Sequence, residues 1–420
     1  MRRLLPVLAL VLSAPAWGGE VRVRAVPGAL VGAVAAAEAG DRLRLAPGTH
    51  DGPVVIDRPL TVEGEGGARP RVDGGGEGSV FLVTAPDVTI RGLEIVGSGS
   101  GHEEIDSGVR LLEGAKRALI EDNRLLGNLY GVDIHGAQDA IVRANVIEGR
   151  RDRRMNDRGN GVYVWNAPGA EVVGNDIRWG RDGVFVNTSR ANVFRGNRFR
   201  DLRFAVHYMH ANDSTVADNV SIGNDLGYAV MFSRGVTIAG NASIGDRAHG
   251  IMLNYANDSR VEGNLVQGGE DRCLFIYNAH KNTILGNRFE GCAIGVHFTA
   301  GSERNEIARN AFIGNRTQVK YVGSRWVDWS VDGVGNHWSD HAGFDLDGDG
   351  IADAPYRPND TMDRILWTQP AARLLLGAPA VQLVRWAQRA FPALLPGGVI
   401  DPAPLMAPPP LPEPAWDIAK

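Results

Sequence analysis

A chain of 420 residues is long enough for two or three domains, and its formal net charge of −5 gives no indication of a nucleic-acid partner. The 54 glycines follow no collagen period, so they indicate many tight turns. Two cysteines are too few for a disulfide framework.

The first 19 residues have the three parts of an export signal. Arg2 and Arg3 give a charged start, residues 4–12 form an apolar core, and residues 14–16 make a small-residue cleavage site. The apolar run is too short to span a bilayer, and no second run of about 18 apolar residues follows. We therefore expect residues 1–19 to be removed and the mature chain to be soluble.

The next segment, residues 20–60, reads as a cap that leads into short strands. Residues 30–39 are rich in alanine without an internal proline, which predicts a short helix ending at Gly40. Alternating apolar runs split by Pro and Gly follow it and predict strands. A helix over one end of a stack of coils hides the edge groups that would otherwise pair with another chain.

From residue 123 to 310 an asparagine returns at steps of 22, 30, 22, 22, 22, 23, 23 and 23 residues. A fixed period of this size is typical of a solenoid, which overrides the prior of several domains. The strands are too short and too Gly-broken for helices, so we predict an all-β, right-handed parallel β-helix over residues 20–335. The asparagines are Asn123, Asn145, Asn175, Asn197, Asn219, Asn241, Asn264, Asn287 and Asn310.

We interpret these asparagines as structural. Asn tolerates the left-handed region of a turn, and its amide can bond to neighbouring backbone and to the next Asn in the stack.

The strand that opens each repeat allows inward and outward positions to be separated. Aligned by eye, the strands cover residues 131–135, 161–165, 183–187, 205–209, 229–233, 250–254, 273–277 and 295–299. Their second and fourth positions are all apolar and should point into the coil. One outward column then holds Asp133, Tyr163, Phe185, His207, Met231, Met252, Phe275 and His297. The other holds His135, Trp165, Asn187, Met209, Ser233, Asn254, Tyr277 and Thr299.

An outward stripe so rich in aromatic, Met and His side chains indicates a binding surface, or one that the protein's own loops or tail cover. Thioether and imidazole groups together suit Cu(I) rather than Ca²⁺ or Mg²⁺. The candidate Cu(I) contacts are His207, Met209, His210, Met231 and Met252, with ordinary packing as the alternative. The candidate partner surface consists of Tyr163, Trp165, Phe185, Phe275, Tyr277 and His297.

The step of 30 residues reflects an inserted loop, residues 149–161, which is rich in arginine. It is either a solvated loop or an electrostatic docking element for an acidic partner. Its candidate contacts are Arg150, Arg151, Arg153 and Arg154.

The two cysteines, Cys273 and Cys292, lie in neighbouring repeats but three positions out of register. We expect a free buried pair, with a disulfide as the alternative; their role does not follow from the sequence.

After Asn310 the repeat fades into a terminal loop, residues 336–364, whose acidic residues have calcium-loop spacing. Oxygen ligands stand at positions 1, 3, 5 and 9 with Gly350 at position 6, but Tyr356 replaces the acid expected at position 12. The loop is either a structural Ca²⁺ site or an Asx-rich turn. The candidate ligands are Asp345, Asp347, Asp349 and Asp353.

Residues 365–420 form a C-terminal extension with an amphipathic helical part and a Pro-rich tail. The helical part, residues 370–391, is interrupted near Gly377 and Pro379, and the tail is expected to be extended. This end either caps the coil or docks onto a membrane partner. The apolar and aromatic content, including Trp386 and Phe391, favours docking.

Taken together, these features give the chain a resemblance to the NosD family of CASH-type β-helix proteins. The resemblance covers the export signal, the Asn-laddered coils, the segment NHWSDHAGFDLDGDGIADAPY (residues 336–356) and MDRILW (residues 362–367). The block at residues 336–356 is its most specific part, because a β-helix alone is also found in sugar-binding and sugar-cleaving proteins.

The resemblance implies a periplasmic maturation protein for nitrous oxide reductase, peripherally attached to the inner membrane. It implies as partners the permease and ATPase of an ABC transporter, the reductase, whose copper–sulfur centre is assembled, and a copper chaperone lipoprotein. No catalytic or cofactor-binding residue carries over. The alternative is a periplasmic carbohydrate-binding or polysaccharide-modifying protein. A lyase or hydrolase needs paired carboxylates on one outward face, and these columns contain only Asp133.

Overall fold

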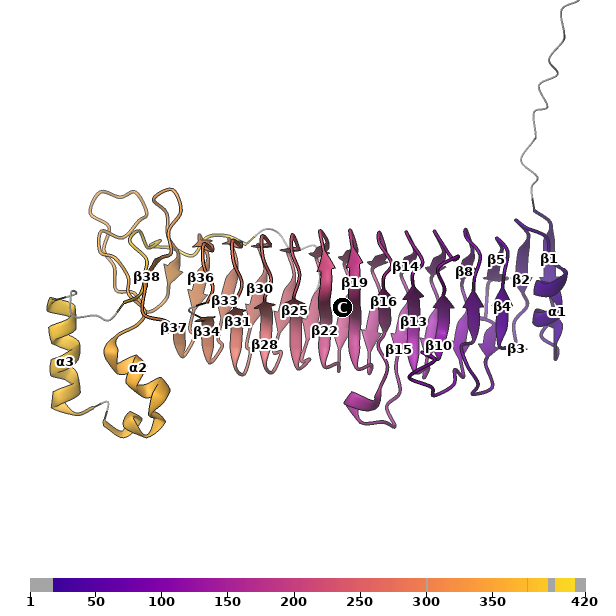
Figure 1. The fold of residues 1–420 in the computed structure, drawn as a ribbon, viewed down its shortest axis with the longest axis horizontal. Coiled ribbons are helices and arrows are strands. Elements are labelled where there is room, and N and C mark those ends of the chain that lie inside the picture. Colours follow the sequence, from indigo (N-terminus) through magenta and orange to yellow (C-terminus); the bar gives the residue numbers. More distant parts are fainter. Residues whose placement is uncertain (1–17, 300, 376, 392–396, 412–420) are drawn as a thin grey trace, which may run out of the picture.

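The computed structural model describes residues 18–299, 301–375, 377–391 and 397–411 of the chain. Most of them form a single rod of short coils stacked side by side, running from the N-terminal to the C-terminal end in Figure 1. Three strands of each coil pair in parallel with the equivalent strands of the coils before and after, which makes three long sheets along the rod. The architecture is the parallel β-helix that the asparagine period predicts. The predicted export signal, residues 1–19, lies almost wholly outside the described residues.

The first sheet has 13 strands and begins at the N-terminal end. Its strands are β1 (Glu20–Val23), β2 (Arg42–Leu45), β5 (Thr61–Gly64), β8 (Thr89–Arg91), β11 (Leu119–Glu121), β14 (Ile141–Arg143), β17 (Glu171–Val173), β20 (Val193–Arg195), β23 (Thr215–Ala217), β26 (Thr237–Ala239), β29 (Arg260–Glu262), β32 (Thr283–Leu285) and β35 (Glu306–Ala308).

The second sheet has 12 strands, carries the longest ones, and contains the outward columns of interest. Its strands are β4 (Val54–Ile56), β7 (Phe81–Val83), β10 (Ser107–Leu111), β13 (Tyr130–His135), β16 (Val162–Trp165), β19 (Asp182–Arg190), β22 (Phe204–Asn212), β25 (Leu226–Met231), β28 (His249–Asn254), β31 (Arg272–Tyr277), β34 (Ile294–Thr299) and β37 (Thr317–Val322).

The third sheet again has 13 strands, and a separate pair of strands, β38 (Trp326–Asp328) and β40 (Gly398–Ile400), lies at the C-terminal end. The strands of the third sheet are β3 (Thr49–Asp51), β6 (Arg71–Asp73), β9 (Glu94–Val96), β12 (Arg124–Leu126), β15 (Val146–Glu148), β18 (Asp176–Arg178), β21 (Arg198–Arg200), β24 (Val220–Ile222), β27 (Ala242–Ile244), β30 (Leu265–Gln267), β33 (Arg288–Glu290), β36 (Ala311–Ile313) and β39 (His337–Trp338).

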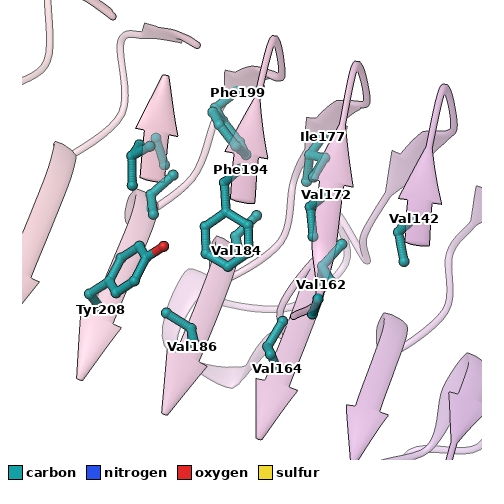
Figure 2. Packing of buried hydrophobic residues seen from close by; sticks show 14 of the residues in the cluster. Val142, Val162, Val164, Val172, Ile177, Val184, Val186, Phe194, Phe199 and Tyr208 are labelled. Carbon is teal, nitrogen blue, oxygen red and sulfur yellow. The ribbon is translucent and has the colours of Figure 1, made fainter. Parts of the chain in front are cut away.

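The core of the rod is the interior of the coils, where apolar side chains of all three sheets meet. In Figure 2, Val162 and Val184 of the second sheet point toward Phe194 of the first and Phe199 of the third. All four are fully buried. Alternation along each strand therefore separates a sealed interior from an outer face that carries the polar and functional side chains.

The asparagines form a continuous hydrogen-bonded ladder along one corner of the rod. Asn219, for example, donates from its backbone N and from Nδ2 to Oδ1 of Asn241, at 3.0 and 2.9 Å. Its Nδ2 also donates to the carbonyl of Phe194 at 2.9 Å. Each coil thus satisfies the buried amides of its neighbour, which confirms the structural interpretation.

We expected the asparagine to be the left-handed residue of this corner. In the structure it is the residue before the asparagine. That position holds Gly in several coils, and Asp122, Ala144, Asp218 and Arg309 in others, with φ between 51° and 55°. The asparagine amide can then point inward, because the turn has already been made by the preceding residue.

Both ends of the rod are covered. Helix α1 (Ala29–Ala36) packs at the N-terminal end, close to the predicted range, with Leu30 and Val34 buried. At the other end the segment 398–406 lies over the last coil. The buried Asp401 accepts hydrogen bonds there from Asn336 N (2.7 Å) and Trp338 Nε1 (2.8 Å). This part of the tail therefore caps the rod.

The C-terminal helices stand apart from the coils in Figure 1. They are α2 (Thr361–Thr368), the 3₁₀ turn η2 (Pro370–Leu375) and α3 (Pro379–Ala390), with the expected interruption near Gly377. A further 3₁₀ turn, η1 (Met155–Asp157), lies in the inserted loop. Among the described residues, no helix is both long and apolar enough to cross a membrane.

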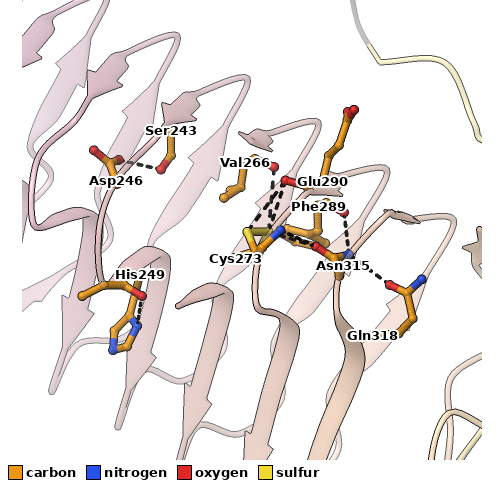
Figure 3. Close-up of a disulfide and its surroundings, with 11 residues drawn as sticks. Ser243, Asp246, His249, Val266, Cys273, Phe289, Glu290, Asn315 and Gln318 are labelled. Carbon is orange, nitrogen blue, oxygen red and sulfur yellow. Dashed lines mark hydrogen bonds between the residues drawn. A yellow bond between two sulfur atoms is a disulfide. The ribbon is translucent and has the colours of Figure 1, made fainter. Parts of the chain in front are cut away.

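The expectation of two free cysteines is wrong: Cys273 and Cys292 form a disulfide (Figure 3). Cys273 stands at the corner position that Gly250 holds in the preceding coil. Cys292 stands at a turn position that is held by Asp246 two coils earlier. Their offset in sequence is compensated by the corner of the coil, which brings the two Cα atoms to 5.7 Å. At this turn position Asp246 accepts a hydrogen bond from Asn224 N, and Asn315 accepts one from Cys292 N. Gly269, in the coil between Asp246 and Cys292, has no side chain that could do the same. The disulfide lies where this second column of hydrogen bonds, which is separate from the asparagine ladder of residues 123–310, is interrupted.

Candidate functional site

The outer face of the second sheet carries two neighbouring columns of side chains, and the strand register fixes their members. The first column runs Arg110, Asp133, Tyr163, Phe185, His207, Ala229, Met252, Phe275, His297 and Lys320. The second runs His135, Trp165, Asn187, Met209, Met231, Asn254 and Tyr277. All but one of the aligned strands match the alignment made from the sequence.

The exception is β25, where the sequence alignment is displaced by two residues. Tyr228 and Val230 point inward and are buried, whereas Phe232 is 42% exposed and Ser233 is a buried residue of the following turn. The corner of this coil is Gly227, where a Cβ would come within 2.5 Å of the carbonyl of Gly250. The 22-residue step from Ala205 to Gly227 already indicates this register, but the apolar run after it conceals the signal.

The corrected register changes which of the soft-ligand residues are direct neighbours. Met231 is the direct neighbour of Met209 on the adjacent strand. Ala229 lies between His207 and Met252 in the first column. Ala229 is fully buried although its methyl group points outward, so larger neighbouring side chains close over it. The four soft-ligand residues of the sequence prediction therefore surround one small residue.

His210, the fifth predicted copper contact, belongs to a different feature. It has a left-handed backbone (φ 51°) at the turn after the strand, and its ring stacks on Phe232 at 5.2 Å. Phe232 stacks in turn on Tyr255, also at 5.2 Å, and both are left-handed as well. His210 is therefore the first ring of an exposed aromatic row beside the columns, not part of the group around Ala229.

His207 is held in one orientation by a buried ion pair. Its Nδ1 lies 3.0 Å from Oδ2 of Asp182, and Arg203 donates two hydrogen bonds to the same carboxylate at 2.8 and 2.7 Å. Burial raises the pKa of Asp182, but the bonds from His207 and Arg203 outweigh it and leave the pKa below its ordinary value. Because an ionised carboxylate can only accept, Nδ1 of His207 carries a proton, and Nε2 is the nitrogen that has a lone pair when the ring is neutral. A metal-ligating histidine is held in the same way.

A second buried carboxylate, Asp133, has the opposite environment. It is fully buried, its nearest cation is Arg110 Nε at 3.1 Å, and neither of its oxygens has a hydrogen-bond partner among the described residues. Burial raises the pKa of Asp133 to about 7, against the opposing effect of Arg110. Burial, with Asp133 nearby, raises the pKa of Tyr163 to about 12.

The predicted partner-surface rings lie on this face, and each of them packs against a neighbouring ring. Tyr163 and Phe185 are 5.3 Å apart and almost parallel, and His135 stacks on Trp165 at 4.2 Å. Stacked rings turn their edges outward, so these pairs do not offer the open faces on which a sugar ring stacks. Tyr277, the last residue of the second column, is 40% exposed.

His297 makes a different hydrogen bond from the other histidines of this face. Arg272 Nε donates to its Nδ1 at 2.9 Å. Burial first, and then the charge of Arg272, lower the pKa of His297 to about 4, so the imidazole is neutral at neutral pH.

In the inserted loop, three of the four predicted arginines have contacts with neighbouring residues. Arg150 donates to the carbonyls of Ser98 and Gly99 at 2.8 and 2.7 Å, which ties the insert to the preceding loop. Arg151 lies over the ring of Trp179. Arg153 donates to Ser100 Oγ at 3.2 Å, and Arg154 is exposed.

The acidic loop brings three of its four predicted ligands together. Ligand oxygens of Asp345, Asp347 and Asp349 lie within 4.8 Å of one another. Asp345 accepts from the backbone N of Gly348 and Gly350, bonds that lower its pKa. The fourth, Asp353, accepts instead from the backbone N of Leu346.

Helix α3 is packed with its polar side toward the protein. Gln382, Arg385 and Gln388 line a cavity of about 740 Å³ between the helix and the end of the rod, and Arg385 pairs there with Asp360 at 3.1 Å. The opposite side is apolar and exposed: Leu383 by 64% and Trp386 by 59%. Ile365, Leu374, Leu375, Val384 and Phe391 are also exposed, and we call these seven residues the apolar end surface.

The fold and these sites define a solenoid protein with a soft-ligand outer face and an apolar end surface. Comparison with known proteins gives the family. Residues 143–343 match the family model "Periplasmic copper-binding protein (NosD)". The chain is 42% identical over 380 residues to the "Probable ABC transporter binding protein NosD" of Stutzerimonas stutzeri, covering 87% of each chain. It is 43% identical over 414 residues to the protein of that name from Pseudomonas aeruginosa, covering 96% of this chain and 95% of the relative.

The chain belongs to the NosD family of periplasmic copper-binding, ABC-transporter-associated proteins, as its sequence motifs predict. These relatives are named as transporter binding proteins rather than as enzymes. Among solved structures, a PL6 alginate lyase in complex with a trisaccharide is similar, with a TM-score of 0.52 over 77% of this chain and 93% of the lyase. At 12% identity, that likeness concerns the fold alone.

Proposed function

We propose that this protein is the periplasmic subunit of an ABC transporter complex that supports assembly of the copper–sulfur centre of nitrous oxide reductase. In this role it is a docking platform, attached to a permease and its ATPase at the inner membrane, and it contacts Cu(I) transiently on its outer face. Copper arrives from a chaperone lipoprotein and leaves toward the reductase. Family membership supports the general role.

The observation that carries the attachment is the reversed packing of α3. An amphipathic helix normally buries its apolar side against its own protein, whereas α3 turns Gln382, Arg385 and Gln388 inward and leaves Leu383 and Trp386 in solvent. Exposed apolar surface of this kind is costly unless another molecule covers it. A permease at the membrane surface, whose outer helices are themselves apolar, is the partner of matching chemistry.

Co-purification from membranes tests this attachment. The double variant Leu383→Asp/Trp386→Asp is expected to lose the permease and ATPase from the purified complex, because charged side chains cannot be buried against apolar helices. Val31→Asp is the matched control, since Val31 is an exposed apolar residue on α1 at the opposite end of the rod. Full recovery of the transporter with the double variant would refute the attachment.

The copper contact is supported by the group around Ala229. His207 presents an Nε2 lone pair, and Met209, Met231 and Met252 add thioether sulfurs from three neighbouring strands. Imidazole and thioether groups suit Cu(I), and the half-buried positions of the three methionines favour a transient contact over a permanent centre.

Cu(I) competition with a chromophoric chelator tests the contact directly. Replacing Met209, Met231 and Met252 together by Leu keeps the apolar volume and removes the sulfurs, so Cu(I) binding should fall while the fold is retained. Copper loading of the reductase in cells should fall with it. If chelator competition and copper loading of the reductase are both unchanged in this variant, the proposal that this face contacts copper is refuted.

A further inference from the structure

His249 lies beside the copper contact on the same outer face. It begins β28, three residues before Met252. Its ring packs against Phe275 at 5.2 Å, and Phe275 is the register neighbour of Met252. The imidazole of His249 and the thioether of Met252 therefore flank the same aromatic ring.

The hydrogen bond of His249 fixes its tautomer. Nδ1 lies 2.6 Å from the carbonyl oxygen of Ala248, a bond drawn as a dashed line beside the labelled His249 in Figure 3. A carbonyl can only accept, so Nδ1 carries the proton and Nε2 keeps the lone pair that a metal needs. A backbone carbonyl on the other ring nitrogen is, like the carboxylate beside His207, a common support of a metal-ligating histidine. Burial also lowers the pKa of His249, which keeps the ring neutral.

His297 has the opposite tautomer on the other side of the same ring. It packs against Phe275 at 5.0 Å, but its Nδ1 accepts from Arg272, so that nitrogen is occupied and the proton lies on Nε2. Its surroundings, Arg272 and Lys320, are cationic as well, which disfavours a metal ion there. The two histidines that flank Phe275 are thus chemically distinct.

We propose that His249 and Met252 form a second Cu(I) site, next to a first site made by His207 with Met209 and Met231, and that His297 belongs to neither. The inference rests on the proposed copper contact and divides it in two. Met231 of the first site and Met252 of the second lie on adjacent strands, and the two histidines are two coils apart, about 10 Å along the rod at the spacing of parallel strands. A Cu(I) ion bound at one site could therefore move to the other, because both offer imidazole and thioether ligands a short distance apart.

The number of Cu(I) ions bound by the oxidised mature chain, measured by competition with a chelator under anaerobic conditions, tests the division. The wild type is expected to bind two equivalents, and His249→Gln and His207→Gln one each. His297→Gln, the matched control beside the same Phe275, should still bind two. Met252→Leu removes the second site without altering any histidine, so it should also bind one and guards against misfolding of the Gln variant.

Long-range ¹H–¹⁵N correlation spectra of the metal-free protein give an independent readout. His249 and His207 are expected as the Nδ1–H tautomer and His297 as the Nε2–H tautomer, and Ag(I) should shift Nε2 of the first two alone. Two equivalents in His249→Gln, or an Nε2–H tautomer for His249, would overturn the second site while leaving the first intact. A wild type that binds no Cu(I) would instead refute the proposed copper contact itself.

Discussion

The two buried aspartates of the outer face should give pH dependences of opposite sign. Asp133 has no hydrogen-bond partner among the described residues, whereas Asp182 accepts from both Arg203 and His207. Replacing either residue by Asn keeps the shape and removes the charge. The variant Asp133→Asn therefore reproduces the protonated form of that carboxyl at every pH.

The magnitude follows from the pKa of Asp133, which burial raises to about 7 from an ordinary value near 4. A raised pKa means that the folded state binds the proton more tightly than the unfolded state. The resulting stabilisation is complete below pH 4 and is lost as the pH rises from about 4 to about 7. Three units at about 1.4 kcal/mol each correspond to about 4 kcal/mol. Between pH 4 and pH 8, the free energy of unfolding of Asp133→Asn should therefore rise relative to that of the wild type by up to about 4 kcal/mol.

The assay is urea denaturation followed by circular dichroism from about pH 2 to pH 8, with hydrogen exchange of the β13 amides as a local readout. Asp182→Asn is the control of opposite sign. The pKa of Asp182 is depressed in the folded state, so ionised Asp182 stabilises the fold above pH 4, and this stabilisation is lost in more acidic solution. Asp182→Asn should therefore have a lower free energy of unfolding than the wild type at neutral pH. If the profile of Asp133→Asn runs parallel to that of the wild type, the reasoning about Asp133 is refuted.

Three further predictions concern the rod and its end. Replacing Cys273 and Cys292 by Ser should lower the free energy of unfolding by about 3 kcal/mol, from the loop of about 20 residues that the disulfide closes. Reduction of the wild type should give the same loss, and an unchanged urea midpoint in both would contradict it. Asn219→Ala should cost about 2–4 kcal/mol, because it leaves the buried backbone N of Asn197 without its acceptor and removes the hydrogen bond to the carbonyl of Phe194, both in the preceding coil; an effect below about 1 kcal/mol would argue against the ladder. Ca²⁺ is expected to slow hydrogen exchange in the acidic loop, and Asp345→Asn/Asp349→Asn should abolish that protection; a wild-type loop that does not respond to Ca²⁺ would leave it as an Asx-rich turn.

The period of the sequence was sufficient for the fold, because a solenoid repeats the same local problem in each coil. The inward positions of nearly every strand and the role of the ladder followed from spacing alone. The alignment failed at β25, where Phe232 follows an apolar run and imitates an inward residue, although its left-handed backbone places it outside. An exposed aromatic residue in that conformation has no local sequence signal.

The chemistry of the outer face was less accessible to the sequence, because it depends on contacts between coils. The tautomers of His249 and His297 are set by Ala248 and Arg272, and the charge of Asp133 by the side chains that cover it. The disulfide was missed for a related reason: Cys273 and Cys292 meet across a corner, so linear register is a poor guide to their separation. Reversed packing of α3 is likewise invisible in an amphipathic pattern, which gives two faces but not their directions.

The stacked sheets have a mechanical consequence for the role proposed. From β22 to β37 the second sheet advances five coils, about 24 Å at the spacing of parallel strands, and each step is fixed by continuous backbone pairing. A rod of this kind does not bend easily, so a rotation applied at the apolar end surface turns the whole rod as one rigid body. A small tilt imposed there by a moving transporter would sweep the copper-facing strands through a larger arc, without any change in the geometry of the ligands they carry.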